Sequence, residues 1–211
     1  MEKKSKNKAV KSGIFIAVFV LSIMIIGVSV SYAYFSANVV GSSDTGENQA
    51  DKLNVTTTLT SGGAINATSL AIIDGSEYLT KAEHFEFTVT NNTDSTVRAK
   101  YAINLTDITI SKNILSKYFK WAIVVNSDTS NAITGDFQDA SLATEGNSDT
   151  TTVTIDSKIL VSEEDALELD IGATDTLTFY LWLENDDNVD QLYLTNGNMT
   201  AKLSLDAFPV R

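Results

Sequence analysis

The stretch LTFYLWLE, residues 177–184, has the strongest β-strand character in the chain. In an extended strand, Leu177 and Phe179 fall on one face and Tyr180 and Trp182 on the other, so both faces are apolar. A short run that is apolar on both faces indicates a strand buried on both sides. The sequence therefore predicts a strand at the centre of a sheet, and the neighbouring stretches show what surrounds it.

A second clear alternation is HFEFTVT, residues 84–90, which places Phe85, Phe87 and Val89 on one face. Another alternating stretch, residues 97–105, follows after the polar sequence NNTDS. Two alternating stretches separated by a short polar turn are typical of a β-hairpin. We therefore predict that these two strands pair antiparallel.

Alternating apolar and β-branched residues recur along the rest of the chain. Further strands are predicted at residues 53–59, 70–73, 119–125, 151–161, 167–171 and 199–205, with a bulge in the fourth near Asp156. Residues 114–118 suggest one helical turn, and residues 126–150 read as a long exposed excursion.

These strands are separated by turn clusters, and almost no helical period follows residue 34. Many short strands with regular turns predict an antiparallel β-sandwich of jelly-roll or immunoglobulin-like topology. A body of this length is typical of one domain, which we place at residues 53–211.

The beginning of the chain has the pattern of an export signal. Five lysines within the first 11 residues precede an uncharged apolar run at residues 14–30, and SYA at residues 31–33 supplies small residues for cleavage between Ala33 and Tyr34. We predict that residues 1–33 are a signal peptide removed by a signal peptidase. The alternative is a retained membrane anchor, because the run approaches the length that spans a bilayer. Either way the body lies outside the membrane, secreted or at the cell surface, and only this segment touches lipid.

Residues 34–52 read as a flexible N-terminal arm. Its first part places Phe35, Ala37 and Val39 on one side of an extended strand, and Gly, Ser, Asp and Asn follow. The arm is either a spacer or a segment that adds a strand to a neighbouring subunit.

The charge of the body is strongly negative. Residues 1–33 hold five of the 15 basic residues and one of the 27 acidic residues, which leaves ten basic and 26 acidic residues, a net charge of −16, on residues 34–211. Such a field repels nucleic acid, so no nucleic-acid partner is expected. The chain has no cysteine, which excludes disulfides and cysteine-based catalysis or zinc sites.

No catalytic residues can be assembled from the sequence. The chain has one histidine, His84, in the outward phase of a predicted strand, and it lacks nucleophile-elbow, phosphate-loop and metalloprotease motifs. We therefore expect no enzyme, no cofactor and no metal site. The acidic loops at residues 163–165 and 184–190 lack EF-hand spacing and read as solvated charge; the second is the better calcium candidate.

Three aromatic residues invite a carbohydrate-binding interpretation. Trp121, however, is in phase with core residues, and Tyr180 and Trp182 are neighbours on one strand face. Packing between layers is the favoured interpretation for these two.

The junction AYFS, residues 33–36, directly after the long apolar run, resembles the processing site of the TasA/camelysin family. These are exported Gram-positive biofilm-matrix and surface proteins cut by a SipW-type signal peptidase. FEFTVTN (residues 85–91), FYLWLE (179–184) and AKLSLDA (201–207) also resemble segments of related surface proteins.

The resemblance implies a jelly-roll subunit that self-associates into an extracellular fibre. In such fibres the mature N-terminal arm completes the sheet of the next subunit, and Phe35, Ala37 and Val39 would be the donated side chains. The competing interpretation is a membrane-tethered, adhesin-like binding module that keeps residues 1–33.

Overall fold

The computed structural model describes residues 37–39, 52–59, 64–68, 70–138 and 146–210. The chain divides into two units, Met1–Tyr34 and Phe35–Arg211, and all the described residues belong to the second. The predicted leader, its cleavage residues Ala33 and Tyr34, and Phe35 lie outside these ranges. Among the residues described, no helix is long and apolar enough to cross a membrane.

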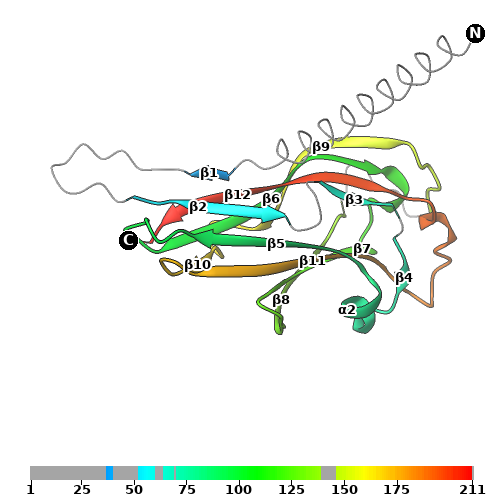
Figure 1. Ribbon diagram of the computed structural model, residues 1–211. Coiled ribbons are helices and arrows are strands. Elements are labelled where there is room, and N and C mark those ends of the chain that lie inside the picture. The colour runs from blue at the N-terminus through cyan, green and yellow to red at the C-terminus, as the bar shows by residue number, and fades with distance from the viewer. Residues whose placement is uncertain (1–36, 40–51, 60–63, 69, 139–145, 211) are drawn as a thin grey trace, which may run out of the picture. The chain divides into compact units, whose positions relative to one another are not determined.

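Two mostly antiparallel sheets pack face to face (Figure 1), so the predicted all-β sandwich is confirmed. The first sheet contains β1 (Ala37–Val39), β3 (Ile65–Ala67), β6 (Ala99–Ser111), β9 (Thr152–Val161), β10 (Leu167–Leu169) and β12 (Met199–Pro209). The second contains β2 (Val55–Leu59), β4 (Ile72–Ile73), β5 (Glu83–Asn91), β7 (Phe119–Val125), β8 (Asp128–Asp136) and β11 (Thr174–Glu184). Short helical segments are η1 (Gly75–Glu77), α2 (Tyr78–Lys81), η2 (Lys112–Ile114) and η3 (Leu192–Leu194).

Strand β11 is central in the second sheet, as its sequence predicts. It pairs antiparallel with β5 on one side and β7 on the other. Leu177, Phe179 and Leu181 are fully buried in the main core between the sheets. The opposite face of β11 carries Tyr180 and Trp182, which belong to a second, smaller apolar cluster outside the sandwich.

The predicted hairpin between residues 84–90 and 97–105 is wrong. Strand β5 pairs with β2 and β11 in the second sheet, whereas β6 pairs with β12, β9 and β10 in the first. The connection contains a tight turn, in which Ser95 N donates to Asn92 O, but Asn92 N donates to Asn54 O of the segment before β2 and not to β6. Both strands are strongly alternating because each contributes one face to the same core, not because they pair.

The predicted excursion at residues 126–150 is also partly wrong, because it contains β8. Strands β7 and β8 form a true hairpin, with Val125 opposite Asp128. Asn126 and Ser127 both have positive φ, 51° and 63°, the conformation of the tight turns that match strand twist. The sequence did not indicate β8, because this edge strand is largely exposed and its residues are mostly polar.

Smaller differences concern strand ends and irregularities. Strand β3 was not predicted, and Ile171 is 45% exposed instead of continuing a strand. The helical turn η2 begins two residues before the predicted turn at 114–118 and shares only Ile114 with it. The register of β9 against β6 shifts opposite Ile103 and Asn104, not near Asp156. The irregular residue in β6 is Asp107, whose φ is 49°.

Because β11 is the central strand of its sheet, its inward side chains contribute strongly to the stability of the folded protein. Replacing Phe179 with alanine removes a fully buried ring from the core and is expected to lower the free energy of unfolding by about 3–5 kcal/mol. The matched control is Thr176→Ala, at an exposed position of the same strand, which should change it by less than about 0.5 kcal/mol. Urea unfolding measures both, and equal losses would contradict the assigned face of β11.

Asp149 fixes the backbone just before β9 through hydrogen bonds. Its carboxylate accepts a hydrogen bond from Thr151 N at 2.9 Å and one from Lys112 Nζ at 3.1 Å. The backbone N–H and then the hydroxyl of Thr151, followed by the Lys112 ammonium, lower the pKa of Asp149 to about 2. Because the pKa in the folded state lies below the ordinary value of 3.8, this contribution to stability is complete above 3.8 and is lost as the pH falls toward 2.

We therefore expect Asp149→Asn to flatten the pH dependence of stability on the acid side. Thermal unfolding measured from pH 7 to pH 2 should show a smaller fall in Tm below about pH 4 than in the parent protein. The control is Asp156→Asn, at an exposed position of β9. A fall in Tm as steep as that of the parent would show that Asp149 carries no such linkage.

Candidate functional site

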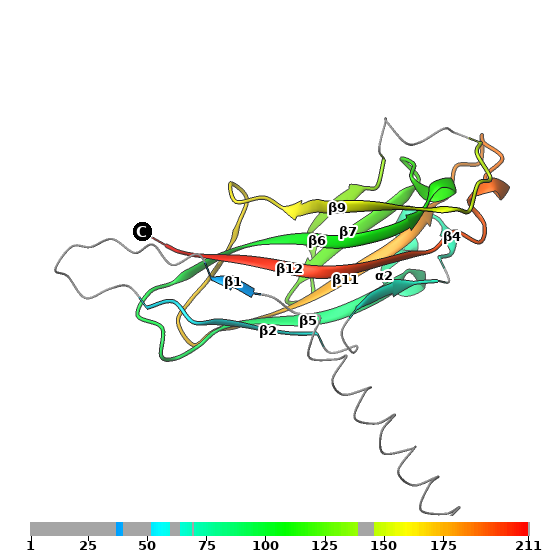
Figure 2. The same cartoon turned by 90° about the horizontal axis from the view of Figure 1, so that it is seen from above.

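The outer edge of β12 is covered by two short strands in succession. On its inner side β12 pairs with β6 from Met199 to Pro209. On its outer side, β3 pairs antiparallel with residues 199–201 and β1 pairs parallel with residues 205–207. Figure 2 shows β1 lying beside β12, far in sequence from the strand that it covers.

The part of β12 that β1 covers belongs to the main core. Leu205 and Ala207 are fully buried, and Asp206 between them is partly exposed. An uncovered edge at this place would expose backbone N–H and C=O groups beside core side chains. The β12 edge is therefore a place where an added strand completes the sandwich.

The register places two of the predicted strand-donation residues at this edge. Ala37 is opposite Leu205, Asn38 is opposite Asp206, and Val39 is opposite Ala207. Phe35, the third predicted donor, lies outside the described residues. The arm thus pairs with its own chain here, at a site that the sequence pattern gave no means of locating.

The pairing between β1 and β12 is short. Its three residue pairs correspond to two or three backbone hydrogen bonds, each contributing on the order of 1 kcal/mol net. Parallel pairing is also slightly less stable per residue than antiparallel pairing. The pairing with β1 therefore contributes only about 2–3 kcal/mol to the cover of this edge.

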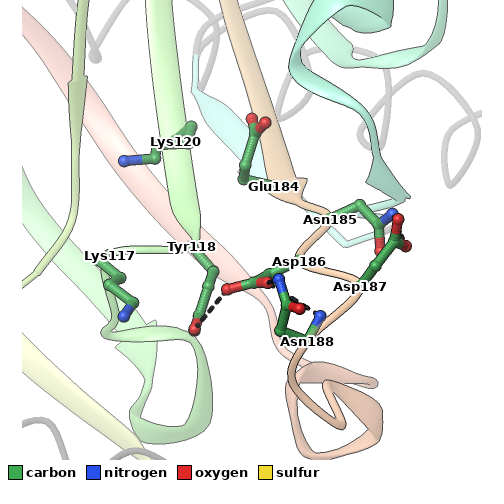
Figure 3. Close-up of a pocket in the computed structure, with 8 residues that line it drawn as sticks. All are labelled: Lys117, Tyr118, Lys120, Glu184, Asn185, Asp186, Asp187 and Asn188. Carbon is green, nitrogen blue, oxygen red and sulfur yellow. Dashed lines mark hydrogen bonds between the residues drawn. The ribbon is translucent and has the colours of Figure 1, made fainter.

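Several carboxylates of the acidic loops accept hydrogen bonds from nearby protein groups. In Figure 3, Asp186 faces Tyr118, whose hydroxyl donates to Asp186 Oδ2 at 3.3 Å, and Asn188 donates to Asp186 Oδ1 through its backbone and side chain. These hydrogen bonds, the Asn188 N–H first, lower the pKa of Asp186. Asp165 is bound by Ser162. Among the described residues no group of three acidic or histidine side chains is placed to hold a metal ion.

His84 is exposed on β5, in the outward phase that its sequence predicts, with its ring 5.8 Å from that of Tyr180. Trp121 is buried in the main core, also as predicted. Tyr180 and Trp182 are packed, but against α2 on the outer face of the second sheet and not between the two sheets. The predicted packing between layers therefore occurs between the second sheet and α2.

Comparison with known proteins does not assign a family. No protein-family model matches the chain, and no curated protein matches it.

Proposed function

We propose that this protein is a secreted structural subunit of an extracellular fibre or biofilm matrix, and that its subunits assemble by donating the N-terminal strand. The observation that supports this most directly is the pairing of residues 37–39 with the β12 edge. A strand that covers this edge in its own chain can make the same backbone contacts on the edge of another chain.

The proposed assembly is an open chain of subunits. The donated surface is the arm and the accepting surface is β12, so the contact is heterologous and extends into a filament unless its rotation closes a ring. Residues 40–51 connect β1 to the segment that leads into β2. Twelve residues can span up to about 40 Å when extended, which is long enough to reach a neighbouring subunit.

The strength of the contact depends on more than the three paired residues of β1. Phe35 precedes β1 in the alternating pattern, and its insertion into a neighbour would add about 2–3 kcal/mol of apolar burial. The net charge of −16 on residues 34–211 opposes association, and protonation of carboxylates weakens this repulsion. Assembly is therefore expected to be favoured at mildly acidic pH.

The remaining parts of the proposal follow from the resemblance in the leader junction. The sandwich is of the jelly-roll type, the protein is TasA/camelysin-like, and a signal peptidase cuts between Ala33 and Tyr34 before assembly. No catalytic function is proposed, and the partner of the subunit is another copy of itself.

The second candidate is a membrane-tethered, adhesin-like module. Its support is a pair of pockets with polar and aromatic lining near the end of β11 in the second sheet, whereas β12 belongs to the first sheet. The two candidates differ in the fate of residues 1–33: intact mass of the cell-associated protein shows whether they are retained.

Deleting residues 34–40 is expected to abolish polymers while leaving the sandwich folded. Protein starting at Tyr34 and protein starting at Gly41 would be incubated at neutral and mildly acidic pH and examined by electron microscopy, with circular dichroism as the folding control. Filaments from the longer protein alone are expected, because only it carries the donated strand. Filaments of equal length from both would contradict strand donation, and persistent monomers from both would favour the tethered module.

A further inference from the structure

The outer face of the second sheet carries two adjoining pockets near the end of β11. The larger, about 410 Å³, lies between Lys117 and Tyr118 on one side and residues 185–188 on the other (Figure 3). The smaller, about 290 Å³, lies beside Tyr78, Trp182 and Asp136. Lys120 and Glu184 line both pockets, so the two adjoin at these side chains, and together we call them the recess. Their volumes are of the size that holds small organic ligands.

The smaller pocket has an aromatic wall. The Tyr78 ring stacks on Trp182 with 4.9 Å between centroids and 16° between planes, and it meets Tyr180 edge-on at 5.3 Å. Trp182 is only 5% exposed, whereas Tyr78 is partly exposed. The aromatic surface available to a ligand is therefore that of Tyr78, supported from behind by the indole.

Glu184 is fixed at the boundary between the pockets. Trp182 Nε1 donates to Glu184 Oε2 at 2.7 Å, and Gly75 N donates to Glu184 Oε1 at 3.0 Å. A Cβ atom on Gly75 would lie 2.6 Å from Glu184 Oε1, so a larger residue at this position would displace the carboxylate. Two hydrogen bonds occupy half of the acceptor sites of a carboxylate, which leaves the others for a ligand.

The polar lining has both signs of charge. Lys120 Nζ lies 3.4 Å from Asp136 Oδ2, and Lys117 stands across the larger pocket from Asp186 and Asp187, with Asn185 and Asn188 beside them. A ligand of one strong charge would meet repulsion from part of this lining. A ligand rich in hydroxyl groups can donate to the carboxylates and accept from the ammonium and amide groups at the same time.

The aromatic and polar lining of the recess and the net charge of the body together indicate the class of ligand. An aromatic ring beside converging polar side chains suits a ligand with an apolar face and polar edges, as a pyranose ring has. The net charge of −16 on residues 34–211 disfavours polyanions.

We propose that this recess binds a neutral oligosaccharide, with one sugar ring against Tyr78 and the next between Lys117 and residues 185–188. The proposal is independent of strand exchange, because the recess is built from the second sheet and α2, whereas β1 and β12 belong to the first sheet.

The chain has a built-in reporter for this recess. Of its two tryptophans, Trp182 stacks behind Tyr78 in the smaller pocket, whereas the Trp121 ring is buried in the main core on the other face of the sheet. Cellotetraose and tetraacetylchitotetraose would be titrated into protein starting at Tyr34, with tryptophan fluorescence and calorimetry as readouts. We expect a saturable fluorescence change and heat for at least one of them, with Kd at or below about 1 mM.

Two variants test the recess from its two sides. Tyr78→Ala removes the aromatic wall, and Lys120→Met removes the shared ammonium; each is expected to raise Kd at least about tenfold. Glu86→Gln is the matched control, because Glu86 is exposed on the outer face of β5 and lines neither pocket. It should leave Kd unchanged, and Tm measurements show whether each variant is folded.

The proposal is overturned if neither sugar produces a saturable signal at about 10 mM. It is equally overturned if folded Lys120→Met binds as tightly as the parent, or if an acidic polysaccharide such as alginate binds more tightly than both neutral sugars.

Discussion

The edge of β12 has to be covered, and much of the first sheet follows from this requirement. The strand is fully paired with β6 on one side, and its side chains Leu205 and Ala207 are completely buried. Its other side would leave backbone donors and acceptors unpaired next to the core. The protein meets the requirement with two short strands, β3 and β1, from sequence-distant segments. A cover made of a few residues at one end of the domain is the part of the sandwich that can most easily be exchanged.

In the proposed assembly, the strand that covers the β12 edge of one sandwich is also the strand that joins two subunits. The main core is formed by long strands whose pairing is internal and extensive, such as β11 between β5 and β7, and it does not require the arm. The arm adds a small amount of stability at the β12 edge, and the arm of another chain could supply the same contacts. In the proposed assembly, each subunit would fold before it associates, and one chain's strand would then replace another's on the β12 edge.

The sequence showed where several strands form but not which strands pair with each other. Alternation identified β5, β7, β11 and β12 because each buries one face in the core. It misassigned the partner of β5, since two strands that face the same core from opposite sheets have the same pattern as a hairpin. It missed β8 because an exposed edge strand needs no apolar face, and only the turn at Asn126 and Ser127 reveals it.

For the candidate site, the sequence indicated the arm but not its acceptor. Ala37 and Val39 are recognisable as strand-forming residues, whereas the register that places them beside Leu205 and Ala207 depends on long-range pairing. The recess on the second sheet could not be predicted either. Its residues come from η1, α2, β7, β8, the end of β11 and the loops that precede β7 and follow β11. They converge only through the pairing of those strands and the position of α2.

Whether the strand that covers β12 belongs to the same chain or to another can be measured directly by disulfide trapping. Asn38 and Asp206 are opposite each other in the parallel register, at a Cα separation that suits a disulfide, and the chain has no other cysteine. Asn38→Cys combined with Asp206→Cys would be oxidised before and after incubation under assembling conditions and analysed by non-reducing electrophoresis. The account predicts cross-linked monomers before assembly and a ladder of cross-linked multimers afterwards, whereas Asp206→Cys alone gives at most dimers. Cross-linked monomers in both samples, together with filaments that persist in the cross-linked state, would contradict it.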